Sequence, residues 1–83
     1  MRVQVKYRGQ LALLAGAATE DFDAVNIEKL LNSIRKRYSR EAEKTARAML
    51  ITVNGVSINL LRQYKTVLST GDTVSFFPIC AGG

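Results

Sequence analysis

Residues 49–60 read MLITVNGVSINL, and this stretch decides the fold. Every second residue is apolar on both sides of a central Asn54-Gly55 pair, as expected for two strands that each bury one face. Asn-Gly tolerates a positive φ at both centres of a type I′ turn, whose twist matches that of two antiparallel strands. The stretch therefore predicts a β-hairpin. Its alternating apolar residues are Met49, Ile51 and Val53 before the turn and Val56, Ile58 and Leu60 after it.

The main helix is expected ahead of this hairpin. Apolar residues recur there at three- and four-residue spacing, which places them on one stripe of a helix. Asn26 suits the N-cap position, because its side chain can accept a hydrogen bond from a free amide of the first turn. Residues 41–47, EAEKTAR, contain no strong breaker, so they either continue this helix or restart one. The stripe consists of Ile27, Leu30, Leu31, Ile34 and Tyr38.

Two strands are expected near the start of the chain. Residues 2–8 alternate between apolar and polar side chains and predict a strand. Residues 17–23 are weakly patterned and are interpreted as a second strand that pairs with the first. Between them, Gly9 and Gly16 bracket one or two turns of helix.

The last strand is expected at residues 73–78, after a connection that turns at Gly71-Asp72. Phe76 is in register with Val74 and is expected to face the core. Pro78 has no amide hydrogen, so it ends the ladder of hydrogen bonds or needs no partner there. With only one substantial helix to cover the sheet, the pattern predicts a two-layer α+β domain.

Composition narrows the classes of function. The 83 residues are enough for one domain. The chain has no histidine and one cysteine, so a Ser-His-Asp triad, an internal disulfide and a cysteine metal site are excluded. No phosphate-binding glycine loop is present, and no apolar run approaches the ~20 residues of a membrane span. We therefore expect a cytoplasmic protein that binds no metal or cofactor and is not an enzyme alone.

The net charge of +5 is partly local. A basic cluster lies at the end of the main helix, where cations complement the negative end of the helix dipole. A solvated helix end is the favoured interpretation, with an acidic protein partner next and nucleic acid last. The cluster consists of Arg35, Lys36, Arg37 and Arg40.

The sequence ends in FFPICAGG. Gly82 and Gly83 have no Cβ, so a tail of this kind is thin enough to pass through a narrow channel of another protein. A carboxylate is inert as an acyl group and must first be activated, most simply as a mixed anhydride with AMP. No residue here could perform that step, which implies a partner enzyme that binds ATP.

The chain resembles a known family along nearly its whole length. GDTVSFFPICAGG at residues 71–83 and VKYRGQLALLAGA at residues 5–17 are similar to the small subunits of molybdopterin synthase. These belong to the ubiquitin-like β-grasp sulfur carriers, alongside the thiamine sulfur carrier and the ubiquitin-related modifiers. The resemblance implies a mixed sheet of four to five strands with one main helix on one face. It also implies a globular domain at 1–78 and a flexible tail at 79–83.

The resemblance also implies a site. Gly83 would be adenylated by a ubiquitin-activating-type enzyme that uses ATP, and converted to a thiocarboxylate. The sulfur would then pass to the pterin precursor in the large subunit of molybdopterin synthase. Gly82, Ala81 and Cys80 would thread the partner's channel. The docking surface would include Phe77, Pro78 and Ile79.

Some features depart from the family, and alternatives stay open. Ile79 and Cys80 stand where the family has a second proline and a small non-cysteine residue, and many of its carriers are acidic. The Cys80 thiol is either incidental or able to attack the adenylate or form an acyl disulfide. The chain could instead be a protein modifier or a carrier for tRNA thiolation. A β-grasp interaction domain with an accidental Gly-Gly is the third interpretation.

Overall fold

The structure is a computed structural model that describes residues 1–79. The expectations for Cys80, Ala81, Gly82 and Gly83 fall outside the described residues. Five strands and three α-helices account for most of the chain, with two short 3-10 helices, η1 and η2, before the last strand. In order they are β1 Arg2–Lys6, α1 Gly9–Ala15, β2 Thr19–Asp23, α2 Ile27–Arg37, α3 Arg40–Arg47, β3 Leu50–Val53, β4 Val56–Ser57, η1 Ile58–Leu60, η2 Gln63–Lys65 and β5 Thr73–Phe77.

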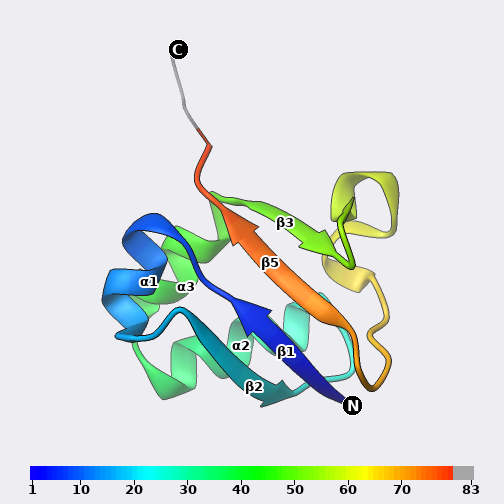
Figure 1. Ribbon diagram of the computed structural model, residues 1–83, viewed down its shortest axis with the longest axis horizontal. Coiled ribbons are helices and arrows are strands. Elements are labelled where there is room, and N and C mark those ends of the chain that lie inside the picture. Colours follow the sequence, from blue (N-terminus) through cyan, green and yellow to red (C-terminus); the bar gives the residue numbers. More distant parts are fainter. Residues whose placement is uncertain (80–83) are drawn as a thin grey trace.

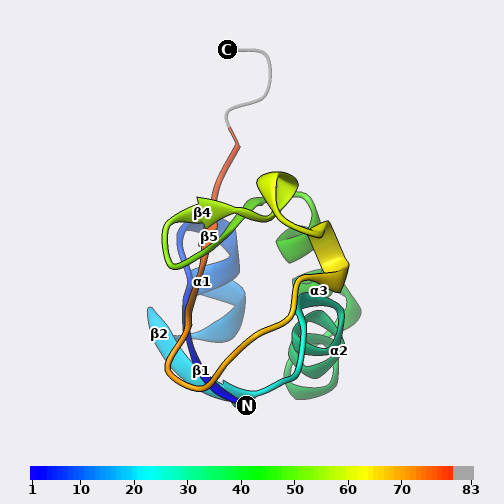
Figure 2. The same cartoon turned by 90° about the vertical axis from the view of Figure 1, so that its right-hand side faces the viewer.

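The five strands form one mixed sheet in the order β2-β1-β5-β3-β4 (Figure 1). β1 pairs antiparallel with β2 and parallel with β5, while β5 and β4 each pair antiparallel with β3. The weakly patterned strand expected at residues 17–23 is therefore confirmed as β2. Figure 2 shows the sheet nearly edge-on, with α2 and α3 on one side of it. Figure 1 looks onto the other side, called the open face here, which no helix of the described residues covers.

The hairpin forms at the expected turn, but its second strand is shorter than expected. Asn54 and Gly55 have φ values of 51° and 85°, so both centres of the turn are left-handed, as a type I′ turn requires. β4 then ends at Ser57, because the Ser57 hydroxyl accepts the amide of Asn59 and starts η1. The expected alternation through Leu60 was wrong, and Leu60 is 80% exposed.

The helical layer contains two helices joined by a tight break. Asn26 caps α2 as expected, accepting the amide of Lys29 at 2.8 Å. The helix ends at Tyr38, and the Ser39 hydroxyl caps α3 through the amide of Ala42. Of the two possibilities for residues 41–47, the chain restarts a helix. Consequently two helices, α2 and α3, lie on the same face of the sheet.

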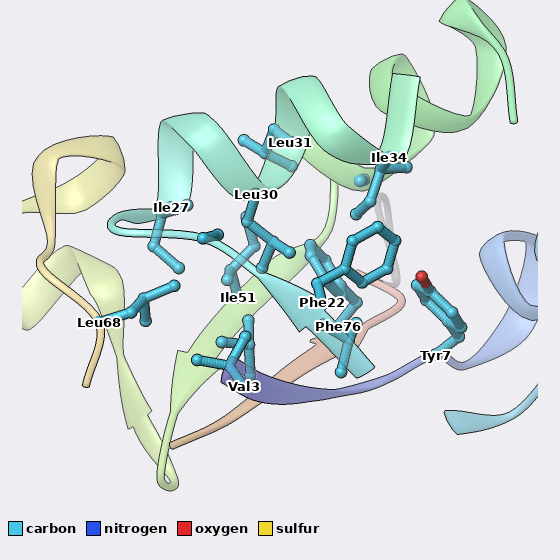
Figure 3. Close-up of a cluster of buried hydrophobic side chains, with 14 of the residues drawn as sticks. Val3, Tyr7, Phe22, Ile27, Leu30, Leu31, Ile34, Ile51, Leu68 and Phe76 are labelled. Carbon is cyan, nitrogen blue, oxygen red and sulfur yellow. The ribbon is translucent and has the colours of Figure 1, made fainter. Parts of the chain in front are cut away.

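The core lies between the sheet and these helices (Figure 3). It combines the α2 stripe with alternate residues of the strands, and Phe76 is fully buried, as expected. Its ring stacks near that of Tyr7, with the ring centres 6.3 Å apart. The core therefore reaches to within three residues of the last described position, Ile79.

A carboxylate network links β2 to α2. Glu20 accepts hydrogen bonds from the hydroxyls of Tyr7 and Tyr38 at 2.8 and 2.6 Å and pairs with Arg37 at 3.0 Å. Burial alone would raise the pKa of Glu20, but the hydrogen bonds from Tyr38, Tyr7 and Arg37 outweigh it and hold the pKa below its ordinary value. Burial, followed by the bond to Glu20, raises the pKa of Tyr7. The ionised Glu20 therefore stabilises the native state.

Replacing Glu20 with glutamine is expected to lower the free energy of unfolding by about 1 kcal/mol at neutral pH. Because the folded-state pKa is lowered, this stabilisation is present above the ordinary pKa of 4.5 and is lost as the pH falls through the folded-state value. Urea unfolding from neutral pH to about pH 3 should therefore show the wild type and Glu20→Gln converging. The control is Glu41→Gln, at an exposed carboxylate without an ion pair among the described residues. A deficit in Glu20→Gln that stays constant with pH would contradict this account.

Candidate functional site

The candidate site is the end of β5, where the chain leaves the sheet (Figure 1). Val74 and Phe76 point into the core and are fully buried, whereas Phe77 is only partly buried. Pro78 follows the strand and ends its pairing. Ile79 is 60% exposed. The three residues predicted to dock a partner, Phe77, Pro78 and Ile79, therefore follow one another here, the first partly exposed and the other two exposed.

The start of β5 is fixed by two turns that bond to each other. The Asn54 side chain accepts the amide of Thr73 at 2.9 Å and donates to Asp72 at 3.0 Å. Asp72 in turn accepts the amide of Ser69 at 2.8 Å. The hairpin turn thus holds the turn before β5 and sets the register of the last strand. Sequence patterns indicated both turns but not this connection between them.

The end of β5 is held by Arg8 and by Gly9, the first residue of α1. Gly9 has a φ of +60°, and a Cβ built there would lie 2.8 Å from Cγ of Pro78. The Arg8 guanidinium lies over the Phe77 ring, 5.2 Å from its centre. Arg8 and Gly9 therefore fix where the chain leaves the sheet. The sequence analysis missed both residues, because nothing in a single sequence relates residue 9 to residue 78.

Replacing Gly9 with alanine is expected to displace Pro78 and Ile79 and to cost about 1 kcal/mol more stability than the same change at Gly16. Gly16 is a matched control, since its φ is +69° and a Cβ there would meet nothing within 4 Å. Both variants force alanine into the left-handed region, so only the contact with Pro78 differs. Urea unfolding measures the difference, and amide chemical shifts at Phe77 and Ile79 report the displacement. Equal losses with unchanged shifts at Ile79 would show that Gly9 does not position the chain.

Two hollows lie on either side of Ile79, which lines both of them. One has a volume of about 250 Å³ and is bordered by Met49, Ile51, Ile58 and Tyr64. The other, about 510 Å³, lies beside α3 and is bordered by Met49, Lys44 and Pro78. On the open face, Leu50 pairs with Phe77 across the strands and is 37% exposed. The site thus offers a small apolar surface with recesses on both sides.

An ionic network around Arg47 joins two of the helices. Arg47 of α3 pairs with Glu28 of α2 and with Glu43, both at 2.9 Å, and lies over the ring of Tyr64. The hydrogen bonds that Arg47 donates to Glu28 raise the pKa of Arg47 above its ordinary value. This network joins α2, α3 and η2 at one wall of the smaller hollow, and holds that wall in shape.

The basic cluster is remote from this site. In both views the end of α2 lies at the opposite end of the molecule from the last described residues (Figures 1 and 2). Arg37 is paired with Glu20, and Arg35 lies 3.9 Å from Glu43. Half of the cluster therefore stabilises the fold.

We searched residues 1–79 for metal-binding clusters, for side chains with shifted pKa values and for membrane-spanning helices. No group of three or more histidine, cysteine, aspartate or glutamate side chains that could hold a metal is present there. The groups with shifted pKa values belong to the two networks described above and to the Asp23 pair with the N-terminus. None of the described helices is long and apolar enough to cross a membrane. The arrangement can present a segment to a partner.

Comparison with known proteins gives a consistent result. A model of the ThiS family matches residues 5–83. A putative molybdopterin converting factor subunit 1 from Pyrococcus furiosus is 28% identical, with a TM-score of 0.72 over 94% of this chain and 97% of its own. Urm1 from Trypanosoma brucei is 26% identical, with a TM-score of 0.74 over 99% and 95% of the two chains.

A chain of the Amycolatopsis orientalis BexX/CysO complex has a TM-score of 0.83 over 98% of this chain and 99% of its own. It is only 17% identical, which shows the fold alone. No curated protein matches the sequence significantly. These likenesses confirm the ubiquitin-like β-grasp fold expected from the sequence.

Proposed function

The chain belongs to the ThiS family of ubiquitin-like sulfur carriers, and from that premise we propose that it carries sulfur as a thiocarboxylate on Gly83 for molybdopterin biosynthesis. In this proposal Gly83 is the carboxyl terminus of the working protein. The chain is the small, sulfur-donating subunit of molybdopterin synthase, and the large subunit is the partner that receives the sulfur.

The observation that carries the proposal is the way the end of β5 is built. Phe76 anchors the strand in the core, and Gly9 packs against Pro78. From Ile79 onward the sequence continues ICAGG, with two residues that lack a Cβ at its end. A strand end held by packing, followed by a segment that finishes in two glycines, suits a segment that enters a narrow passage in a partner. The likeness to the Pyrococcus furiosus protein supports the choice of pathway.

The chemistry requires partners at each step. A carboxylate oxygen of Gly83 attacks the α-phosphate of ATP and pyrophosphate leaves, which gives an acyl adenylate. A hydrosulfide ion delivered by a partner then attacks the acyl carbon and AMP leaves, so that Gly83 ends as a thiocarboxylate. The activating enzyme, a ubiquitin-activating-type adenylyltransferase, binds the ATP, and the carrier itself holds no cofactor. The carrier contributes the acyl group and the docking surface of Phe77, Pro78 and Ile79.

A second candidate is a ubiquitin-like modifier or a sulfur carrier for another pathway. The likeness to Urm1 from Trypanosoma brucei, at 26% identity, favours keeping it. Both candidates use the same adenylated glycine, so activation alone does not separate them. They differ in the acceptor, which is a pterin precursor in one case and a lysine amine or another substrate in the other.

Reconstitution tests the proposal. The purified chain is incubated with ATP and the adenylyltransferase of the same cells, and then with a sulfur source and the large synthase subunit. We expect pyrophosphate release that depends on Gly83, a thiocarboxylate on that residue, and a stable complex with the large subunit. A ladder of heavier conjugates in cells that disappears when Gly82 and Gly83 are deleted, without such a complex, would favour the modifier. A chain without Gly82 and Gly83 is the control for both readouts.

A further inference from the structure

The open face of the sheet has an uneven distribution of charge. Along β1 the outward residues are Arg2, Gln4 and Lys6, and Arg8 follows the strand. Arg2 lies 3.4 Å from Asp21, and the terminal amine lies 2.7 Å from Asp23. The carboxylates of β2 are therefore paired at the end of the sheet where the chain begins.

At the other end of the same face, two cations have no carboxylate opposite them. The register places Lys6 beside Thr19 on β2 and Ser75 on β5. Ser75 in turn lies beside Thr52 of β3. One step nearer the exit of the chain, Arg8 covers the Phe77 ring. Neither Lys6 nor Arg8 forms an ion pair within residues 1–79, and both are exposed.

These two cations border the apolar surface at the exit. Phe77 and Leu50 lie side by side on the open face, and Ile79 continues past them. The patch formed by Lys6, Arg8, Leu50 and Phe77 is called the exit patch here. It has an apolar side on β5 and β3 and a basic side on β1, and hydroxyl residues separate Lys6 from β3.

We propose that the exit patch docks a protein whose complementary surface has an apolar centre and carboxylates on the side that meets β1. This inference rests on the proposed function, because the partner that receives the tail must contact the surface from which the tail leaves. Charge complementarity identifies the chemistry of that partner. An acidic rim would pair with Lys6 and Arg8 and would speed the encounter, since exposed charges at the edge of an interface act mainly on the association rate.

A nucleic acid is a poorer occupant of the same patch. Phosphate backbones bind through many cations along a groove or strip, and affinity grows with the number of contacts. The exit patch has two cations beside a phenylalanine and a leucine, and the apolar half would stay unsatisfied. Bulk tRNA is therefore the competing occupant that the experiment must exclude.

The test uses the adenylyltransferase of the same cells and measures the rate of Gly83 adenylation against carrier concentration at low and high salt. Lys6→Glu reverses a charge that is exposed and forms no ion pair within residues 1–79. Its matched control is Lys36→Glu, an equal change in net charge at an exposed position on α2. We expect Lys6→Glu to lower kcat/KM about tenfold at low salt with kcat unchanged, whereas Lys36→Glu stays within about twofold. At about 1 M salt, where screening acts over about 3 Å, the two variants should agree.

Other outcomes overturn the inference. If Lys6→Glu and Lys36→Glu lose the same activity, or if the loss with Lys6→Glu persists at high salt, the patch does not meet an acidic surface. Tight binding of bulk tRNA that Lys6→Glu abolishes, with adenylation unaffected, would assign the patch to nucleic acid. If the wild-type chain is adenylated normally, a failure of these predictions leaves the proposed function intact. If the wild type is not adenylated at any salt concentration, the proposed function and this inference fall together.

Discussion

Replacing Gly82 with valine is expected to lower thiocarboxylate formation at Gly83 by about 100-fold or more and to leave the free energy of unfolding unchanged. The proposed function requires residues 80–83 to pass through a narrow passage in a partner and to place one carbonyl carbon at a reactive centre. A branched side chain beside Gly83 widens the segment, and displacement by about 1 Å can cost 100-fold in rate. Among residues 1–79 the last member of the buried core is Phe76, and we expect the change at Gly82 to leave its packing intact.

The comparison needs graded variants and a stability readout. Gly82→Ala adds one methyl group and should give an intermediate rate. Adenylation and thiocarboxylate formation are followed by mass spectrometry of the C-terminal peptide, and urea unfolding is measured on the same samples. A valine variant that reacts normally would contradict the narrow passage. Parallel losses of stability and activity would instead place Gly82 in the folded domain.

Replacing Phe76 with alanine is expected to destabilise the domain by about 3–5 kcal/mol. Phe76 is fully buried and packs beside Tyr7 on the helix side of the sheet. A small domain is stable by only about 5–10 kcal/mol, so this variant should lose most of its stability. The melting temperature should fall by roughly 15–30 °C.

Phe77 provides the matched control at the next position. It is the same residue type on the same strand, but it faces the open side and is partly exposed. Phe77→Ala should cost about 1 kcal/mol in stability and should weaken binding to the partner more than Phe76→Ala does per folded molecule. Thermal unfolding and partner binding, each corrected for the folded fraction, separate the two roles. Equal destabilisation by the two changes would refute the assignment of the faces.

Local signals in the sequence predicted most of the fold. Asn54-Gly55 specified the turn, because few other dipeptides accept two positive φ values in a row. Asn26 specified the start of α2 through a single hydrogen bond to Lys29. The alternation of Val74 and Phe76 specified which face of β5 is buried. Each of these features depends on neighbours within a few residues.

Features that depend on distant contacts could not be predicted in this way. The sequence indicated only that Gly9 marks the start of a short helix. Its packing against Pro78 joins positions far apart in the chain. The second hairpin strand was predicted to span the five residues 56–60, but the Ser57 cap diverts the chain into η1 after two residues of strand. The basic cluster was predicted to be a solvated helix end, but Arg37 forms an ion pair with Glu20. A residue distant in the sequence determined the outcome at Gly9 and at Arg37, whereas the Ser57 cap is a local contact with the amide of Asn59.

The sequence analysis predicted a docking surface at the end of the last strand, and that role stays a prediction. Sequence placed Phe77, Pro78 and Ile79 on a docking surface, and the structure brings them together beside two hollows. The basic side of the exit patch was not foreseen, because Lys6 comes to lie beside Ser75 and Arg8 over Phe77 only when β1 pairs with β5. The roles of Cys80, Ala81, Gly82 and Gly83 stay predictions.

The central claim is that Gly83 carries sulfur, and one measurement tests it most directly. The protein is isolated from its native cells, and its C-terminal peptide is fragmented by mass spectrometry. Fragmentation is necessary because oxidation of Met1, Met49 or Cys80 changes the intact mass by nearly the same amount as replacing oxygen by sulfur. The account predicts that one oxygen of the Gly83 carboxylate is replaced by sulfur in part of the population. An unmodified carboxylate that also resists adenylation by the activating enzyme of those cells would contradict it.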